Sequence, residues 1–179
     1  SYSSPSVAEN NPTTILVKVS HVAARLDFSQ FDVTLNDFEG NPTVVFDEAK
    51  FVNLQQNGKI VEGDASVNVK DGAFLNRSNR IGTKWTDMGT AYGYANQYKQ
   101  DSEMNTALYV KFTVDGRTFE KTYPINPAGI TKEVDHNGIK GGYLYDIKVR
   151  WTITPDWGDS TIEFYTRDWV HNSIPEIVL

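Results

Sequence analysis

The most regular alternation of apolar and polar residues lies near the end of the chain, at residues 143–154. Its odd positions are all apolar: Tyr143, Tyr145, Ile147, Val149, Trp151 and Ile153. Side chains of a strand alternate with a period of two, so these groups share one face. A helix is excluded because its 100° step would spread them around the axis. The stretch predicts a strand of an antiparallel sheet, with one side on a core and the other in water.

The start of the chain predicts a strand that changes face. Apolar residues occupy the odd positions of 13–19 and then the even positions of 22–28. Since a slip of one residue reverses the faces of a strand, we expect a bulge near residue 20. A short helix over 22–26 is the alternative interpretation.

Three shorter apolar runs follow, and residues that favour turns separate them. These runs are 31–35, 43–46 and 51–54. After the third run, Asn57 and Gly58 suit the positive backbone angles of a tight hairpin turn. This pair predicts a returning strand at 59–61.

The strongest hairpin signal lies at residues 108–123. Alternating stretches at 108–114 and 117–123 flank Asp115 and Gly116, a pair that favours the type I′ turn of a two-residue hairpin. Pro124 should end the second strand, because proline has no backbone donor for the ladder. By contrast, residues 63–105 show no sustained period. There we expect long loops with short strands near 66–69 and 84–85.

A turn at 155–159 and a final strand at 161–169 complete the pattern. Strands that recur every ten to fifteen residues or so, with no convincing helix between them, predict an all-β, antiparallel sandwich. We expect residues 1–12 to be a flexible lead-in, 13–170 to form one domain and 171–179 to be a tail.

Composition narrows the classes of function. The formal charge is 17 minus 23, or −6, and no long basic run is present, which argues against a nucleic-acid partner. Without cysteine the chain has no disulfide, thiolate nucleophile or cysteine zinc site. No apolar run approaches the roughly 20 residues that span a bilayer.

Motifs of catalysis and cofactor binding are missing from the sequence. It contains no P-loop, dinucleotide-binding glycine motif, Gly-x-Ser-x-Gly elbow or His-Glu-x-x-His motif. His21, His136 and His171 lie far apart and lack the spacing of metal ligands. Asp156 and Asp159 belong to an acidic turn that suits Ca²⁺, but a plain turn held by Asx hydrogen bonds is the favoured interpretation. We therefore predict a protein that is not an enzyme and that uses no cofactor or metal.

Aromatic residues of the irregular middle third suggest a second hypothesis. Trp85, Tyr92, Tyr94 and Tyr98 fall close together in the sequence. Exposed aromatic faces stack on sugars, so these residues are candidates for a platform in an extracellular glycan-binding sandwich. Packing beneath the loops is the favoured interpretation of the same residues.

The last predicted strand carries large apolar groups on both faces. Ile162 and Phe164 occupy one face, and Tyr165 and Trp169 occupy the other. A strand of this kind needs cover on both sides, and an unpaired apolar edge attracts another chain. The alternative is a last strand that packs within its own domain.

Both ends of the chain resemble one family. Residues 17–28 (VKVSHVAARLDF) are similar to the opening strand of the C-terminal domain in the fimbrillins of Bacteroidetes, the FimA and Mfa families of pilus subunits. Residues 143–154 (YLYDIKVRWTIT) and 162–169 (IEFYTRDW) resemble the last two strands, which commonly finish at a tryptophan. The match covers roughly 40 residues of loose hydrophobic patterns.

The resemblance implies a structural role in a fimbria at the cell surface. Fimbrillins are exported as lipoproteins to the outer membrane and contain two transthyretin-like β-sandwich domains. Proteolysis removes a strand from the first domain, and a C-terminal segment of the neighbouring subunit fills the groove. The chain is too short for both domains and shows no lipobox cysteine, so we interpret it as a C-terminal domain.

By this resemblance, the partners are other pilus subunits and surface ligands of host or bacterial cells. The candidates for inserting side chains are Ile162, Phe164, Trp169, Val170, Ile174, Ile177 and Val178.

Overall fold

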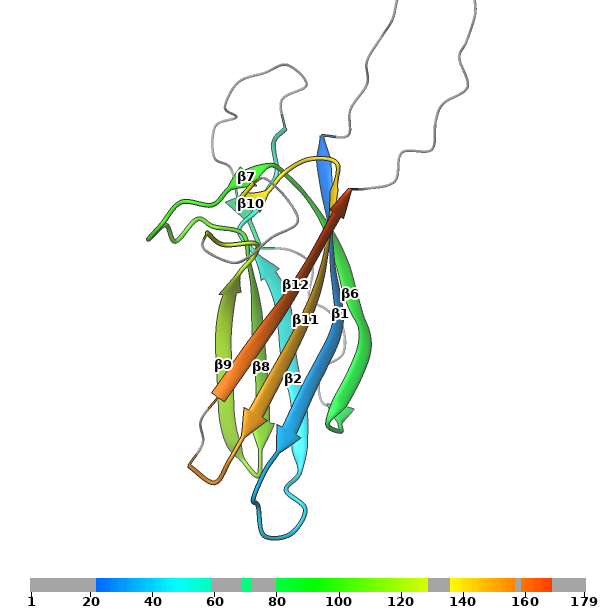
Figure 1. Ribbon diagram of the computed structural model, residues 1–179, viewed down its shortest axis with the longest axis vertical. Helices are drawn as coiled ribbons and strands as arrows, with labels where there is room; N and C mark the ends of the chain where they lie inside the picture. The colour runs from blue at the N-terminus through cyan, green and yellow to red at the C-terminus, as the bar shows by residue number, and fades with distance from the viewer. Residues whose placement is uncertain (1–21, 59–68, 72–79, 129–135, 157–158, 169–179) are drawn as a thin grey trace, which may run out of the picture.

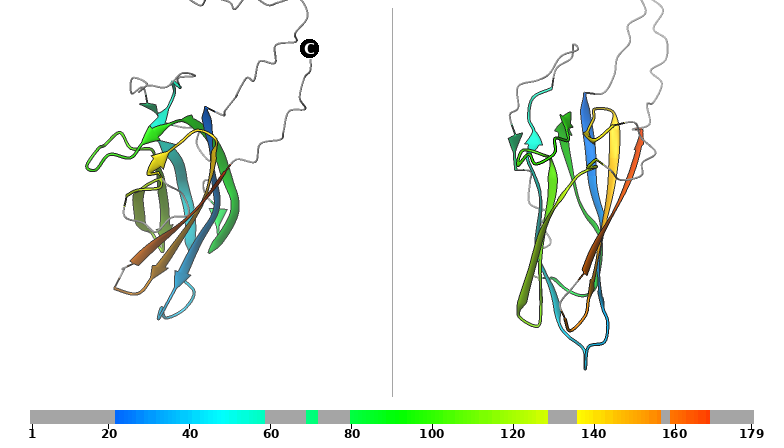
Figure 2. Two further views of the ribbon diagram at one scale, coloured as in Figure 1. Left: turned by 45° about the horizontal axis from the view of Figure 1, so that its top comes forward. Right: turned by 60° about the vertical axis from the view of Figure 1, so that its left-hand side comes forward.

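The computed structural model describes residues 22–58, 69–71, 80–128, 136–156 and 159–168, which form two facing four-stranded sheets (Figure 1). In spatial order, the first sheet contains β12 (Asp159–Asp168), β11 (Tyr143–Ile153), β1 (Ala23–Leu35) and β6 (Lys84–Tyr94). The second contains β5 (Arg80–Ile81), β2 (Val44–Val52), β8 (Ala107–Val114) and β9 (Arg117–Pro124). Figure 2 shows the two layers edge-on in its right-hand view.

Two short pairs of strands lie at the end of the sandwich where β1 begins (Figure 1). One joins β3 (Leu54–Gln55) to β4 (Val69–Lys70), and the other joins β7 (Asn96–Gln97) to β10 (Gly138–Ile139). The predicted all-β sandwich is confirmed. The predicted lead-in at 1–12 and tail at 171–179 lie outside the described residues, so the domain boundaries stay a prediction.

The central strand β11 matches its predicted pattern but not the predicted direction of all its neighbours. Tyr145, Ile147, Val149 and Ile153 are each no more than 1% exposed, which confirms the apolar face. β12 pairs with β11 in the antiparallel direction, whereas β1 pairs with it in parallel. The prediction of a wholly antiparallel sheet is therefore wrong at β1. Alternation reports which face is buried, and it contains no information on the direction of a neighbour.

Bulges join strands that the sequence pattern separates. The register of β1 shifts between Phe28 and Gln30, so the run at 31–35 and most of the run at 22–28 form one strand, with Ala24, Leu26, Phe28, Phe31 and Val33 on the core; Val22 precedes the strand and is exposed. The alternative of a helix at 22–26 is wrong, and the bulge expected near residue 20 lies outside the described residues. A similar shift in β2, between Phe46 and Glu48, joins the run at 43–46 to most of the run at 51–54.

β6 is the strand that the sequence pattern missed, since only residues 84–85 were expected to be extended. Its buried positions are Trp85, Met88, Ala91 and Gly93. Asp87 adopts a φ of 51°, and the local irregularity breaks strict alternation. A Cβ built on Gly93 would lie 3.2 Å from Leu54 Cδ2, so the glycine admits the close approach of β3. Small residues and a bulge thus conceal a strand of eleven residues.

The β8–β9 hairpin is confirmed, and its strands meet at the pair Val114 and Arg117. Asp115 and Gly116 have φ values of 46° and 82°, as a type I′ turn requires. Asp115 Oδ1 also accepts a hydrogen bond of 2.7 Å from the backbone N–H of Thr43. β9 ends at Pro124, as predicted.

The strand predicted to follow the Asn57-Gly58 turn and to pair with β3 cannot be compared with the structure. The candidate strand at 59–61 lies outside the described residues, and the partner that the structure describes for β3 is β4. β4 overlaps the short strand that was expected near 66–69.

Aromatic rings join the two sheets in one core. Phe31 of β1 lies 5.3 Å from Trp85 of β6, 5.5 Å from Phe46 of β2 and 5.3 Å from Phe112 of β8, measured between ring centroids. Trp151 of β11 lies 5.0 Å from Phe112. Offset and edge contacts of this kind add to the hydrophobic gain of burial. Three strands of the first sheet (β1, β6 and β11) and two of the second (β2 and β8) therefore contribute rings to the same cluster.

Two glycines have a positive φ: Gly116 in the β8–β9 turn and Gly138 in β10. Alanine variants of both test the conformation of the backbone and the space around it. Gly116→Ala should cost about 1–2 kcal/mol, because its φ of 82° disfavours a Cβ while the space around it is open. Gly138→Ala should cost about 1–3 kcal/mol more, because its Cβ would also overlap Tyr98 N and Asn96 O. Urea unfolding of both variants measures the difference, and equal losses would contradict the packing at β10.

Candidate functional site

β12, the candidate for intersubunit contact, forms one edge of the first sheet (Figure 1). It pairs with β11 from Asp159, opposite Thr152, to Asp168, opposite Tyr143. Within the described ranges, β11 is its only paired neighbour. The other side of β12 is therefore a sheet edge, whose backbone groups can pair with an added strand.

Two of the predicted inserting residues belong to β12, and the other five follow it in the sequence. Ile162 lies opposite Val149 and Phe164 lies opposite Ile147, both inside the pairing of β12 with β11. The final strand predicted at 161–169 is confirmed, since β12 spans Asp159–Asp168. The remaining candidates lie outside the described residues, and their role stays a prediction: Trp169, Val170, Ile174, Ile177 and Val178.

The four candidate aromatics do not form one exposed platform. Trp85 is 5% exposed and stacks on Phe31 in the core, so its assignment to a sugar-binding surface is wrong. The register near Asp87 turns its ring inward, which alternation alone did not indicate. Tyr92 is 56% exposed, whereas Tyr94 and Tyr98 are partly buried. Tyr94 packs its ring against Gly58.

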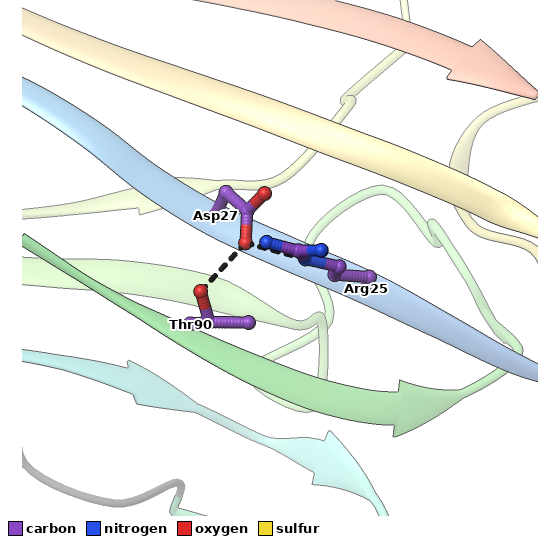
Figure 3. A network of polar contacts seen from close by, with 3 residues as sticks. All are labelled: Arg25, Asp27 and Thr90. Atoms are coloured by element: carbon purple, nitrogen blue, oxygen red, sulfur yellow. Dashed lines mark hydrogen bonds and ion pairs between the residues drawn. The ribbon is translucent and has the colours of Figure 1, made fainter. Parts of the chain in front are cut away.

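Arg25, Asp27 and Thr90 form a polar network on β1 and β6 of the first sheet (Figure 3). The antiparallel pairing of β1 with β6 sets Arg25 opposite Tyr92 and Asp27 opposite Thr90. Asp27 Oδ1 accepts a hydrogen bond of 2.9 Å from Arg25 Nε and one of 2.7 Å from Thr90 Oγ1. The bond to Asp27 raises the pKa of Arg25 above its ordinary value, so the guanidinium stays charged. Sequence reasoning missed this network because it depends on the strand register.

A second polar group surrounds the hydroxyl of Tyr145 at the end of the sandwich. His136 Nε2 lies 2.8 Å from this oxygen, and the backbone N–H of Lys140 donates a hydrogen bond of 2.8 Å to it. Tyr145 is 1% exposed, and burial raises its pKa well above the ordinary value. The contact explains His136 as a packing residue, while His21 and His171 lie outside the described residues. No group of three or more metal-ligating side chains occurs in the described ranges.

The geometry defines a sandwich with two open regions on one sheet, the edge at β12 and the outer surface beside Tyr92. This fold is similar to the folds of two solved proteins whose names refer to cell adhesion and to fimbriae. A putative cell adhesion protein from Parabacteroides distasonis matches 84% of this chain and 52% of its own, with a TM-score of 0.65 and 19% identity. The tip fimbrial protein Mfa3 from Porphyromonas gingivalis, in a C-terminally truncated form, matches the same shares with a TM-score of 0.51 and 12% identity.

These comparisons confirm the resemblance to fimbrillins at the level of the fold. This chain spans about half the length of both structures that it matches. No family model and no curated protein matches the sequence. Among the described residues, no helix is long and apolar enough to cross a membrane.

The buried hydroxyl of Tyr145 predicts a loss of stability in alkali. The unfolded state releases its phenolic proton near pH 10, while the buried hydroxyl in the folded state retains it. Stability from this group is complete below pH 10 and falls above it by up to about 1.4 kcal/mol per pH unit. Tyr145→Phe should cost about 1–2 kcal/mol at pH 7 by removing the hydrogen bonds, yet lose less stability in alkali. Urea unfolding from pH 7 to 11 tests this, and parallel curves would contradict it.

Proposed function

We propose that the chain is a structural domain of a fimbrial subunit that assembles at the bacterial cell surface and supports adhesion. The observation that carries this proposal is the shared sandwich, combined with a C-terminal strand at a sheet edge. The role needs no catalytic group, and the domain acts through its surfaces and its chain end. Its partners are other subunits of the same fimbria.

Assembly proceeds by addition of a β-strand. Main-chain hydrogen bonds of an added strand provide affinity, and alternate side chains fill pockets of the acceptor. We assign β12 as the anchor of the donor segment, because its ten residues pair with β11 in the same chain. The inserting residues then follow Asp168 and are Trp169, Val170, Ile174, Ile177 and Val178.

In this proposal, Ile162 and Phe164 do not insert into the neighbouring subunit. Both belong to the anchor, at positions opposite Val149 and Ile147 of β11. An anchor that is fixed in its own sheet transmits load from the inserted segment to the core. In the bacterium, we place the subunit at the outer membrane after export as a lipoprotein precursor, as in the fimbrillins that the sequence resembles.

Deletion of residues 169–179 should abolish polymer formation and leave the fold intact, because β12 remains in place. We expect loss of the ladder of polymers on unheated denaturing gels of fimbriae from the source bacterium, with an unchanged Tm of the purified chain. The double variant Ile174→Asp, Ile177→Asp should match the deletion. Glu176→Gln is the control, since it changes the charge of the segment without touching an apolar position.

A longer deletion, of residues 159–179, distinguishes the contribution of the anchor from that of the donor segment when it is compared with the deletion of residues 169–179. It removes all of β12, so the hydrogen-bonding edge of β11 is exposed and stability should fall by several kcal/mol, of order 3. The expected Tm is well below that of the shorter deletion. Normal polymers after deletion of 169–179 would refute strand addition by this segment.

A further inference from the structure

An exposed aromatic ring and three polar side chains meet on the outer face of the first sheet. We name Arg25, Asp27, Thr90 and Tyr92 the Tyr92 patch. Tyr92 is 56% exposed, which makes it one of the few large hydrophobic residues of the described ranges that reach solvent. Arg25 and Asp27 keep side-chain exposures of 38% and 20%. The patch is thus open to a ligand.

Strand register places all four groups on one surface. Ala24 and Leu26 of β1 and Ala91 of β6 are buried, so the residues between them face outward. Arg25 lies opposite Tyr92, and Asp27 lies opposite Thr90, two residues away along both strands. Directly opposite residues of an antiparallel pair approach within about 5 Å at Cβ, so the patch is continuous.

The polar groups of the patch are fixed and only partly used. Asp27 Oδ1 accepts hydrogen bonds from Arg25 Nε and Thr90 Oγ1 (Figure 3). In the part of the chain that the structure describes, Asp27 Oδ2 and the terminal guanidinium nitrogens of Arg25 have no further hydrogen bond. A rigid carboxylate acceptor and rigid guanidinium donors therefore lie side by side, next to an aromatic face.

We propose that the Tyr92 patch binds a neutral hexopyranose of a glycan. A sugar ring presents C–H groups on one face, which pack on an aromatic ring, and neighbouring hydroxyls that both donate and accept hydrogen bonds. Asp27 Oδ2 accepts a hydrogen bond from one hydroxyl, and Arg25 donates a hydrogen bond to the oxygen of the next. The ring of Tyr92 supports the apolar face of the sugar.

Charge around the patch selects a neutral sugar. Asp27 lies beside Asp146 in the parallel pairing of β1 with β11, so two carboxylates flank the surface. An acidic sugar would be repelled by both groups, and Arg25 is already paired with Asp27. The same guanidinium disfavours a metal cation. The formal charge of −6 has the same sign as these neighbours.

The second sheet offers a matched control. Tyr109 also stands on an outer face beside a carboxylate, but its hydroxyl donates a hydrogen bond of 2.7 Å to Glu120. Lys50 Nζ lies over its ring, 5.5 Å from the centroid. Its face is therefore covered, and Tyr109→Ala removes an aromatic of the same kind without affecting the patch. The patch residues belong to β1 and β6, whereas the proposed inserting residues follow Asp168, so variants can test binding and assembly separately.

The test uses the full chain and nuclear magnetic resonance titration with neutral methyl hexopyranosides of the gluco, galacto, manno and fuco series, and with their disaccharides. We expect saturable shifts of the backbone amides of Arg25, Thr90 and Tyr92 with at least one sugar. Tyr92→Ala and Asp27→Asn should each weaken binding about tenfold or more, a change of 1.4 kcal/mol. Tyr109→Ala should leave it unchanged.

Several outcomes would overturn the proposal. These are the absence of saturable shifts at the patch with every neutral sugar, equal affinity in Tyr92→Ala and wild type, and preferential binding of glucuronate or sialic acid. Asp27→Asn also removes the partner of Arg25, so its Tm is measured in parallel. Thr90→Val provides a second variant, which loosens Asp27 while its charge is retained, and it should weaken sugar binding with little change in Tm.

Discussion

The contact of Phe31 with rings from both sheets is the interaction on which the rest of this structure depends. Phe31 belongs to β1, which pairs with β11 on one side and β6 on the other. Its ring meets Phe46 and Phe112 of the facing sheet as well as Trp85 of its own. Burial of such rings supplies the main favourable term of folding, and ring geometry fixes the separation of the layers. Both the edge at β12 and the outer surface at β6 are positioned through this strand.

The proposed sites of assembly and of sugar recognition lie towards opposite edges of one sheet. β12 forms one edge and β6 the other, with β11 and β1 between them. A strand added at the C-terminal side therefore leaves the outer surface of β6 uncovered. In the proposed fimbria, each subunit can hold its neighbour and contact a sugar without competition between the two. Only β11 lies between β12 and the strands that carry the Tyr92 patch, and its outward positions include Asp146 and Lys148.

Much of the fold could be predicted from the sequence where alternation was strict. The apolar face of β11 and the Asp115-Gly116 hairpin follow from side-chain period and turn chemistry. β6 could not, because Ala91, Gly93 and a bulge at Asp87 obscure its period. The parallel pairing of β1 was also hidden, since faces and not directions are encoded locally. At the site, Tyr92 was found as an aromatic, whereas Asp27 and Thr90 become partners only through register.

The parallel pairing of β1 with β11 has a consequence for the order in which the chain folds. β8 and β9 meet through a two-residue turn, but β1 must wait for residues more than a hundred positions later in the chain. Contacts between distant residues are costly in loop entropy and slow to form. During synthesis, the first sheet therefore stays incomplete until its last two strands have emerged. Until then the edge of β1 that pairs with β11 has no partner, and an unpaired strand edge attracts other chains.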